Sequence, residues 1–357
     1  MERLASQAVF RYGITTERAV KRNDKKQAAT IGIDIGGTKT LVALFDARFE
    51  ALAEEKFRTV PEKGGVKAFD RALRSAVKRL LTEARKRRLS VHFVGVGCAG
   101  QVDLHQGTLK RSPNLLFLEG YPFRTRLSTL AKSRVFVAND VQCALYGEYR
   151  IGAARKGRHI LAVWIGTGVG GALIIDGRLY LGATNHAGDI GNYLLHAQEG
   201  PESPRKQILD NVASRTAIAG EAATLAAKRW APKLRAKAGT DVTDIRSGDI
   251  AQAIRDGDKA LEKLVRSRAS VVGAAISNFV DFMNPDTVVL GGGLVEALPN
   301  LIRREVKKAV SGHASARASR AARIVVSKLH SHAGTAGAAC LARDMFTGEK
   351  PIDLRDV

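Results

Sequence analysis

The sequence predicts an α/β protein of two similar domains with a cleft between them. Apolar strands alternate with amphipathic helices along the chain, which is the pattern of this class. A strand–glycine turn–strand segment occurs twice, near residues 31–45 and 160–175, and this repetition suggests duplicated domains. The length of 357 residues also favours two domains, at ~100–200 residues per domain.

The composition excludes several classes of protein. The chain is 45% hydrophobic and 26% charged, with a net charge of +22, so wholesale disorder is excluded. No apolar run approaches the ~18–20 residues that span a bilayer, and we therefore expect a soluble, cytoplasmic protein without a membrane partner. The three cysteines, Cys98, Cys143 and Cys340, lie far apart, which argues against a disulfide framework and a cysteine-based zinc knuckle.

The first half of the chain contains one glycine-bearing hairpin. Residues 1–29 are expected to be a basic, flexible lead-in. Apolar runs on both sides of Gly36-Gly37-Thr38-Lys39 predict a hairpin over residues 31–45. Helical spacing of apolar residues from Val66 to Ala84 predicts an amphipathic helix. Short apolar runs predict strands at residues 91–97 and 135–138, and a helix through Leu145 and Tyr149 follows the second strand.

The second half repeats the hairpin. A strand is predicted over residues 159–165, glycine-rich residues 166–171 follow, and a second strand covers residues 172–175. Residues 265–283 form a second amphipathic helix, residues 287–293 form a strand that ends in three glycines, and residues 333–345 form an alanine-rich helix. We expect a first domain over residues 30–145, completed by the C-terminal helix 333–346, and a second domain over residues 146–332.

Three glycine clusters follow predicted strands and could bind an anion. Glycine lets the backbone approach a phosphate closely, and successive N–H groups in such turns form an anion-binding concavity. The alternative is that the glycines merely form tight hairpins. None of the clusters matches the P-loop or the GxGxxG pattern. The clusters and the polar residues beside them are Gly36, Gly37, Thr38 and Lys39; Gly166, Thr167 and Gly168; and Gly291, Gly292 and Gly293.

Two carboxylates are candidates for phosphoryl-transfer chemistry. Asp140 follows the strand over residues 135–138, where it could accept the proton of an attacking hydroxyl. The alternative is that Asp140 only caps the next helix. Asp34 lies inside an apolar strand just before the first glycines, which is a costly place for an unpaired carboxylate. A contact with magnesium-bound water near the phosphates would explain it.

The ordered motifs resemble those of the ROK family of sugar kinases and repressors, within the actin-like, ribonuclease-H-like ATPase superfamily. The resemblance covers roughly residues 30–346. The motifs that carry it are Asp34-Ile-Gly-Gly-Thr-Lys39, Ala99-Gly100-Gln-Val102, Ser112-Pro-Asn114, Asn139-Asp140, Ile165-Gly-Thr-Gly-Val-Gly170, Gly188-Asp-Ile-Gly191 and Leu290-Gly-Gly-Gly293.

The resemblance implies a two-lobed kinase for a sugar and ATP. It assigns the residues 36–39 to a first phosphate loop, the residues 166–168 to a second, and the residues 291–293 to the adenosine. It assigns sugar hydroxyls to Asn114, Asn139 and Asp140, with Gly100 in the same substrate site and Asp140 as general base. Magnesium would bridge the β- and γ-phosphates, with Asp34 as a candidate contact.

The chain departs from the family pattern at two places. Asp189 and Asn192 stand where the family has the glutamate and histidine of Glu-X-Gly-His, and the family's zinc-binding cysteines are absent from residues 194–207. We therefore expect no zinc. A second sugar-binding glutamate aligns with Asp210. Because both carboxylates are one methylene shorter, we hypothesise a substrate other than plain glucose, or a looser specificity.

Three other readings compete with an ATP-dependent sugar kinase. A sugar-sensing regulator of the family would carry a helix-turn-helix domain of ~60–80 residues, whereas only 29 residues precede the first expected strand. A sugar-binding pseudokinase is disfavoured by the retention of Asp140 and of all three glycine clusters. Polyphosphate could be the phosphoryl donor, since the chain is basic.

Two expectations concern binding partners. We do not expect nucleic acid to be a partner, because few aromatics accompany the cations. Family analogy suggests a homodimer.

Overall fold

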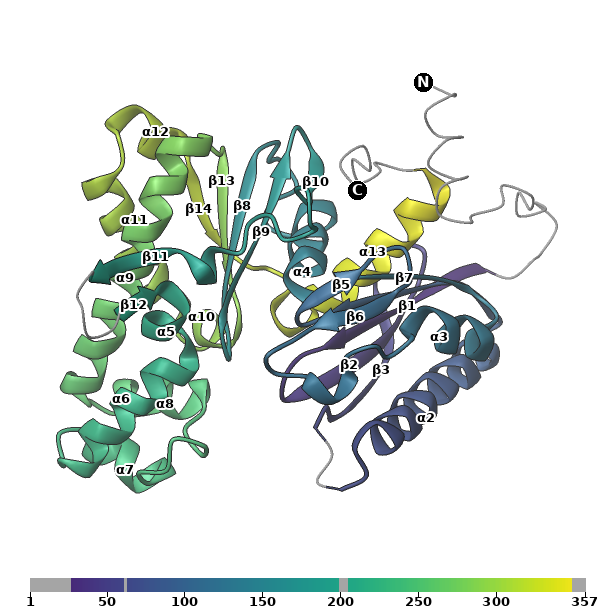
Figure 1. The fold of residues 1–357 in the computed structure, drawn as a ribbon, viewed down its shortest axis with the longest axis horizontal. Coiled ribbons are helices and arrows are strands. Elements are labelled where there is room, and N and C mark those ends of the chain that lie inside the picture. Colours follow the sequence, from purple (N-terminus) through teal and green to yellow (C-terminus); the bar gives the residue numbers. More distant parts are fainter. Residues whose placement is uncertain (1–26, 61–62, 199–204, 349–357) are drawn as a thin grey trace. The chain divides into compact units, whose positions relative to one another are not determined.

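The computed structural model describes residues 27–60, 63–198 and 205–348, which form two compact units. The described part of the first unit lies within residues 27–151, 178–186 and 332–348, and the second comprises residues 152–177 and 187–331. Each unit is built around a five-stranded sheet (Figure 1). Helix α4 (Asp140–Arg150) continues through the expected boundary at residues 145/146, and the first unit extends to Ile151.

The first sheet has the strand order β3-β2-β1-β4-β7. Strands β1 (Gln27–Ile35) and β2 (Lys39–Phe45) form the predicted antiparallel hairpin. Residues 27–29 belong to β1, which corrects their assignment to the lead-in; the remainder of the lead-in lies outside the described residues. Strands β4 (Leu89–Cys98) and β7 (Arg134–Asn139) run parallel to β1, so the three strands present their carboxyl ends at one edge. Strand β3 (Ala51–Arg58) lies at the other side of β2.

Glycines allow helix α13 (Ala333–Thr347) to lie directly on the first sheet. A Cβ at Gly32 of β1 or at Gly95 of β4 would overlap the backbone carbonyls of Thr335 and Ala338, respectively. Helix α13 also crosses α4 closely, because a Cβ at Gly337 would overlap the backbone of α4. Helices α2 (Gly65–Lys86) and α3 (Phe123–Ala131) cover the opposite face of the sheet (Figure 1).

The second sheet repeats the arrangement of the first, in the order β10-β9-β8-β13-β14. Strand β8 (Ile160–Ile165) pairs antiparallel with β9 (Val169–Ile175) and parallel with β13 (Thr287–Gly291). Strand β9 begins three residues earlier than expected, so Gly170 and Gly171 are strand residues rather than turn residues. The sheet is completed by β14 (Arg323–Val326) and β10 (Arg178–Tyr180). The predicted echo of the two hairpins is confirmed.

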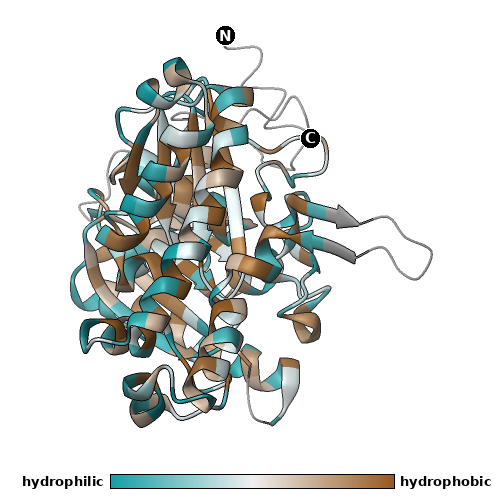
Figure 2. Ribbon diagram, turned by 90° about the vertical axis from the view of Figure 1, so that its left-hand side faces the viewer, coloured by the Kyte–Doolittle hydropathy of each residue, from teal (hydrophilic) through white to brown (hydrophobic). Residues whose placement is uncertain are grey.

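The core of the second unit forms between this sheet and long amphipathic helices. Leu161, Val163 and Ile165 of β8 are buried in one apolar cluster with α6 (Arg215–Ala227), α9 (Lys259–Met283) and α11 (Pro299–His313). In Figure 2 the helices facing the viewer alternate between apolar and polar colouring along their length, as expected for helices that are buried on one face. The predicted helix over residues 265–283 is the larger part of α9.

The remaining described elements connect these cores. They are β5 (Gln101–Asp103), β6 (Thr108–Arg111), η1 (Leu116–Leu118), η2 (Ile190–Asn192), β11 (Leu194–Gln198), β12 (Arg205–Ile208), α5 (Leu209–Ala213), α7 (Pro232–Ala238), α8 (Ser247–Arg255), α10 (Gly293–Ala297), α12 (Ala316–Ala321) and η3 (His330–His332). None of the helices in the described parts of the chain is both long and apolar enough to cross a membrane.

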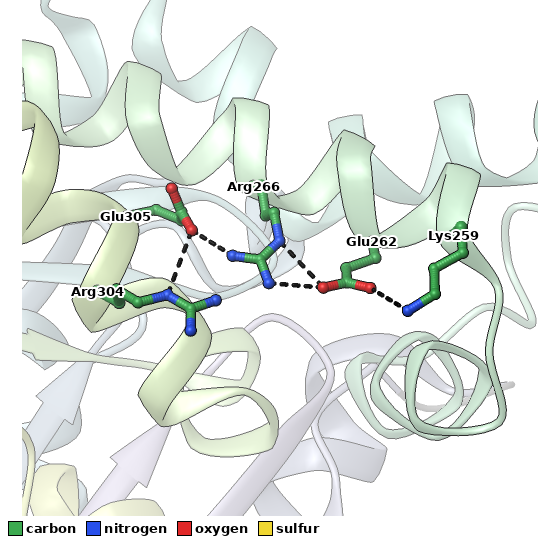
Figure 3. A network of polar contacts seen from close by, with 5 residues as sticks. All are labelled: Lys259, Glu262, Arg266, Arg304 and Glu305. Carbon is green, nitrogen blue, oxygen red and sulfur yellow. Dashed lines mark hydrogen bonds and ion pairs between the residues drawn. The ribbon is translucent and has the colours of Figure 1, made fainter.

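A network of charged side chains joins α9 to α11 (Figure 3). Arg266 of α9 donates to Glu262, at 3.0 Å from Nε and 2.6 Å from Nη2, and also to Glu305 of α11. Lys259 and Arg304 extend the network at its two ends. Because these side chains are partly exposed, the network contributes little to the free energy of unfolding. Its main effect is to fix the orientation of α9 relative to α11.

Candidate active site

Two aspartates of the first unit lie at the carboxyl ends of its parallel strands. Asp34 of β1 is in register with Gly97 of β4, and Gly97 is in register with Ala138 of β7. Gly97 has no side chain, and a Cβ there would lie 3.3 Å from the Cα of Asp140. Asp140, the first residue of α4, therefore lies close to β4 at Gly97, the residue that is in register with Asp34.

Asp140 is not the cap of α4. The cap is Asn139, whose Oδ1 accepts hydrogen bonds from the N–H groups of Val141 at 2.9 Å and Gln142 at 3.2 Å. Asp140 is the first residue of the helix, and its side chain is half-buried. The capping role that could have explained Asp140 therefore belongs to its neighbour.

The carboxyl group of Asp34 sits in an environment that disfavours its charge. Burial and the nearby charge of Asp140 raise the pKa of Asp34 to about 7, although the positive charge of Lys39 acts in the opposite direction. The first turn of α13 covers the group, because a Cβ at Gly334 would lie 2.5 Å from the Asp34 Cγ. A hard cation at this position would relieve the cost of ionisation.

The first glycine turn exposes two backbone donors. The N–H of Gly36 donates to the carbonyl of Lys39 at 3.1 Å, and the carbonyl of Thr38 accepts from Thr59 at 3.0 Å. Within the described residues, the N–H groups of Gly37 and Thr38 have no acceptor. A turn of this kind can receive the oxygens of a phosphate.

Asn114 and Gly100 lie around the same edge. Asn114 is exposed beside the first turn, since a Cβ at Gly37 would lie 3.2 Å from the Asn114 Cβ. Gly100 has φ +124°, which favours glycine, and its carbonyl accepts from Asn139 Nδ2 at 3.1 Å. The structure thus brings the predicted residues of the first unit together: Asp34, Gly36, Gly37, Thr38, Lys39, Gly100, Asn114, Asn139 and Asp140.

The second glycine turn, residues 166–168, is held through its carbonyl groups. The carbonyl of Gly166 accepts from the Arg215 N–H at 2.9 Å, and that of Thr167 accepts from the Thr216 hydroxyl at 2.8 Å. The carbonyl of Gly168 accepts from the Gly166 N–H at 2.8 Å. Among the bonds of the described residues, the N–H groups of Thr167 and Gly168 have no acceptor, which repeats the pattern of the first turn.

Asp210 is part of this second turn's support. Its Oδ1 accepts from the Val169 N–H at 2.5 Å and lies 2.7 Å from the position that a Cβ on Gly168 would occupy. The absence of a side chain at Gly168 therefore makes room for the carboxylate. The sequence analysis assigned Asp210 to the sugar. It did not identify Arg215 or Thr216, for which the sequence offers only their position directly after Ser214, the cap of α6.

The third glycine cluster is mainly a packing device. Gly291 is buried against the Trp164 ring, which a Cβ would overlap, and a Cβ at Gly292 would lie 2.6 Å from the carbonyl of Ile165. Only Gly293 is exposed. Gly291 and Gly292 therefore allow the ends of β8 and β13 to approach each other, and α10 rather than a hairpin follows them.

Asp189 and Asn192, the two departures at the sugar motif, bind each other. Asn192 Nδ2 donates to Asp189 Oδ2 at 2.7 Å, and both residues lie at the ends of the short helix η2. In the described parts of the chain, no three His, Cys, Asp or Glu side chains gather as metal ligands would. All three cysteines are buried and unpaired.

Comparison with known proteins gives consistent matches over most of the chain. The model of the ROK family matches residues 30–345. Glucokinase of Halalkalibacterium halodurans is 26% identical over 318 residues, which are 88% of this chain and 94% of that protein. N-acetylgalactosamine kinase AgaK of Shewanella sp. is 29% identical over 267 residues, which are 74% of this chain and 82% of that protein.

Solved structures agree with these matches. A ROK family glucokinase from Streptomyces griseus, in complex with glucose and AMPPNP, has a TM-score of 0.74 and 26% identity, and the match covers 88% of this chain and 99% of that chain. The expected α/β class with two actin-like sheets is therefore confirmed.

Proposed function

The chain belongs to the ROK family, and from this premise we propose that it transfers the γ-phosphoryl group of ATP to a hydroxyl of a hexose or hexose derivative. Relatives named glucokinase and N-acetylgalactosamine kinase support a sugar kinase. The observation that carries the proposal is the position of Asp140 at the carboxyl end of β7, released from capping α4 by Asn139.

Asp140 is the proposed general base. Phosphoryl transfer needs little covalent help from the protein, so positioning of the hydroxyl and removal of its proton are the main tasks of such a residue. The nearby charge of Asp140 contributes to the raised pKa of Asp34. A carboxylate at the first residue of a helix is also stabilised in its ionised form by the helix dipole.

Asp34 is the proposed contact for magnesium-bound water. A half-buried carboxyl group with a pKa of about 7 fits a hard divalent cation, since oxygen is the ligand that Mg²⁺ prefers. Magnesium would supply charge neutralisation on the transferred phosphate. Within each unit, the glycine turn offers phosphate oxygens two N–H groups that have no acceptor among the described residues: those of Gly37 and Thr38 in the first unit, and those of Thr167 and Gly168 in the second.

The sugar is proposed to contact Asn114 and Asp140 of the first unit. Asp189 is proposed separately as a further residue for a sugar hydroxyl. Gly100 and Asn139 support this edge through their mutual hydrogen bond. Because Asn192 holds the shortened Asp189, we retain the hypothesis of a substrate other than plain glucose, or of a looser specificity. We assign Asp210 to the support of the second turn. Zinc independence, a homodimer and a cytoplasmic location remain predictions.

The test is an ADP-release assay over hexoses and N-acetylhexosamines with the variant Asp140→Asn. We expect turnover to fall by about 10²–10⁴-fold, with the dissociation constant for ADP nearly unchanged. Asp241→Asn, at an exposed carboxylate, is the matched control and should keep full turnover. Unchanged turnover in Asp140→Asn would remove its role as base, and a wild-type protein inactive with every sugar would indicate a pseudokinase.

A further inference from the structure

A half-buried arginine lies beside the second turn and has no acidic partner among the described residues. Arg215 is the first residue of α6, and its N–H donates to Gly166. Its guanidinium reaches the segment before α8, where Nη1 donates to the carbonyl of Ile245 at 3.2 Å. Within the described residues, the Arg215 side chain makes no ion pair with a carboxylate. A guanidinium held in this way can still donate most of its N–H groups.

A second arginine adds positive charge at the same place. Arg246 follows Ile245 directly and is exposed. Its backbone N–H donates to the Asp249 carboxylate at 3.0 Å, whereas its guanidinium makes no ion pair with a carboxylate among the side chains that the structure describes. Burial lowers the pKa of Arg215, and the charge of Arg246 lowers it further. Holding two like charges near each other costs free energy, which a bound anion would offset.

The arginines lie at the carboxyl ends of the parallel strands of the second sheet. Arg215 contacts the turn that ends β8, and a Cβ on Gly293, just after β13, would lie 3.6 Å from the Ser247 hydroxyl. Ligands of open α/β sheets bind at this end of the strands. The N–H groups of Thr167 and Gly168, which have no acceptor in the described parts of the chain, belong to the same turn.

We infer that Arg215 and Arg246, with the N–H groups of Thr167 and Gly168, bind a phosphoanhydride chain. This chemistry is shared by the phosphates of a nucleoside triphosphate and by inorganic polyphosphate. The planar guanidinium forms paired, charge-assisted hydrogen bonds with phosphate oxygens, which makes arginine better suited to this ligand than lysine. The inference rests on the proposed function and deepens it, because it names residues that bind the phosphoryl donor through its phosphate chain.

The experiment measures binding by calorimetry, without a sugar, for ADP, inorganic tripolyphosphate and adenosine. Arg215→Met keeps the aliphatic stem and the backbone bond to Gly166 but removes the charge. Arg303→Met removes one exposed charge from α11 of the same unit and is the matched control. Arg215→Lys keeps the charge but loses the planar, forked arrangement of N–H donors. Thermal unfolding checks that each variant is folded.

Arg215→Met should bind ADP and tripolyphosphate about 10- to 100-fold more weakly, since hydrogen bonds to charged groups contribute ~1.5–3 kcal/mol. Its affinity for adenosine should not change, and the salt dependence of anion binding should become shallower. Arg246→Met should show a smaller loss, Arg215→Lys an intermediate one, and Arg303→Met none. Equal affinities in Arg215→Met and Arg303→Met, or an equal loss for adenosine, would overturn the inference.

Two further measurements distinguish the two possible donors, and they distinguish a failure of the proposed function from a failure of the anion site. Turnover with ATP and with long-chain polyphosphate is compared, and the donor whose KM rises in Arg215→Met is the one that uses the site. If the wild-type protein binds tripolyphosphate but phosphorylates no sugar, the proposed function fails while the anion site stands. If the wild-type protein binds none of the phosphate compounds, the anion site itself is refuted.

Discussion

Replacing Asp34 by asparagine should stabilise the protein at high pH. The folded protein raises the pKa of Asp34 from 3.8 to about 7, so the folded state holds a proton that the unfolded chain has released. The stability that this proton contributes is fully present below pH 3.8 and is lost as the pH rises through about 7. At ~1.4 kcal/mol per pKa unit, the cost of the ionised group approaches about 4 kcal/mol, and this is an upper bound because the side chain is partly exposed.

The assay is thermal or urea unfolding of the nucleotide-free protein in EDTA, followed at pH 8 and at pH 5. Asp34→Asn should be more stable than the wild type at pH 8, and the difference should shrink at pH 5. Asp140→Asn removes one cause of the raised pKa, so Asp34→Asn should gain less in that background. A stability difference that is the same at both pH values would refute the reasoning.

Three further substitutions test the local geometry. Asn139→Ala should destabilise the protein by about 1 kcal/mol through loss of the helix cap, measured by urea unfolding, whereas Asn139→Asp should retain most of it. Gly337→Ala should destabilise the protein, because its Cβ would overlap the backbone of α4. Gly312→Ala should leave stability unchanged or raise it slightly, because that helical Cβ meets nothing within 4 Å; similar melting temperatures for the two variants would contradict this. Asp210→Ala should speed amide hydrogen exchange at Val169, whereas Asp210→Asn, which keeps an acceptor, should not.

The hairpins and their turns were predictable because their signals are local. Glycines between apolar, β-branched runs specify both bends, and the structure confirms both pairs of strands. Strand β3 was not predicted. It is an edge strand whose exposed face carries charges such as Glu54 and Lys56, so it lacks the continuous apolar run of the central strands. The first residues of β1 were assigned to the lead-in for a related reason. Gln27 and Ala28 are exposed, so they lack the buried apolar character of the rest of the strand.

The site was only partly predictable, because several of its contacts join distant parts of the chain. Asp34 and Asp140 could be named from strand ends alone. That Gly334 covers Asp34 cannot be read from residues 300 positions apart in the sequence, and neither can the bond from Arg215 to Ile245. The assignment of Asp210 rested on alignment with a family motif, whereas the hydrogen bond to Val169 depends on the turn that it faces.

The packing of α13 on β1 and β4 has a consequence for synthesis of the protein. A ribosome makes the strands β1 and β4 early, but it makes α13, the helix that covers their glycine-lined face, only after the whole second unit. Nascent and truncated chains must therefore expose an uncovered sheet, which is the kind of surface that chaperones and proteases recognise. Asp34 therefore acquires the covered environment that raises its pKa only after α13 has been made.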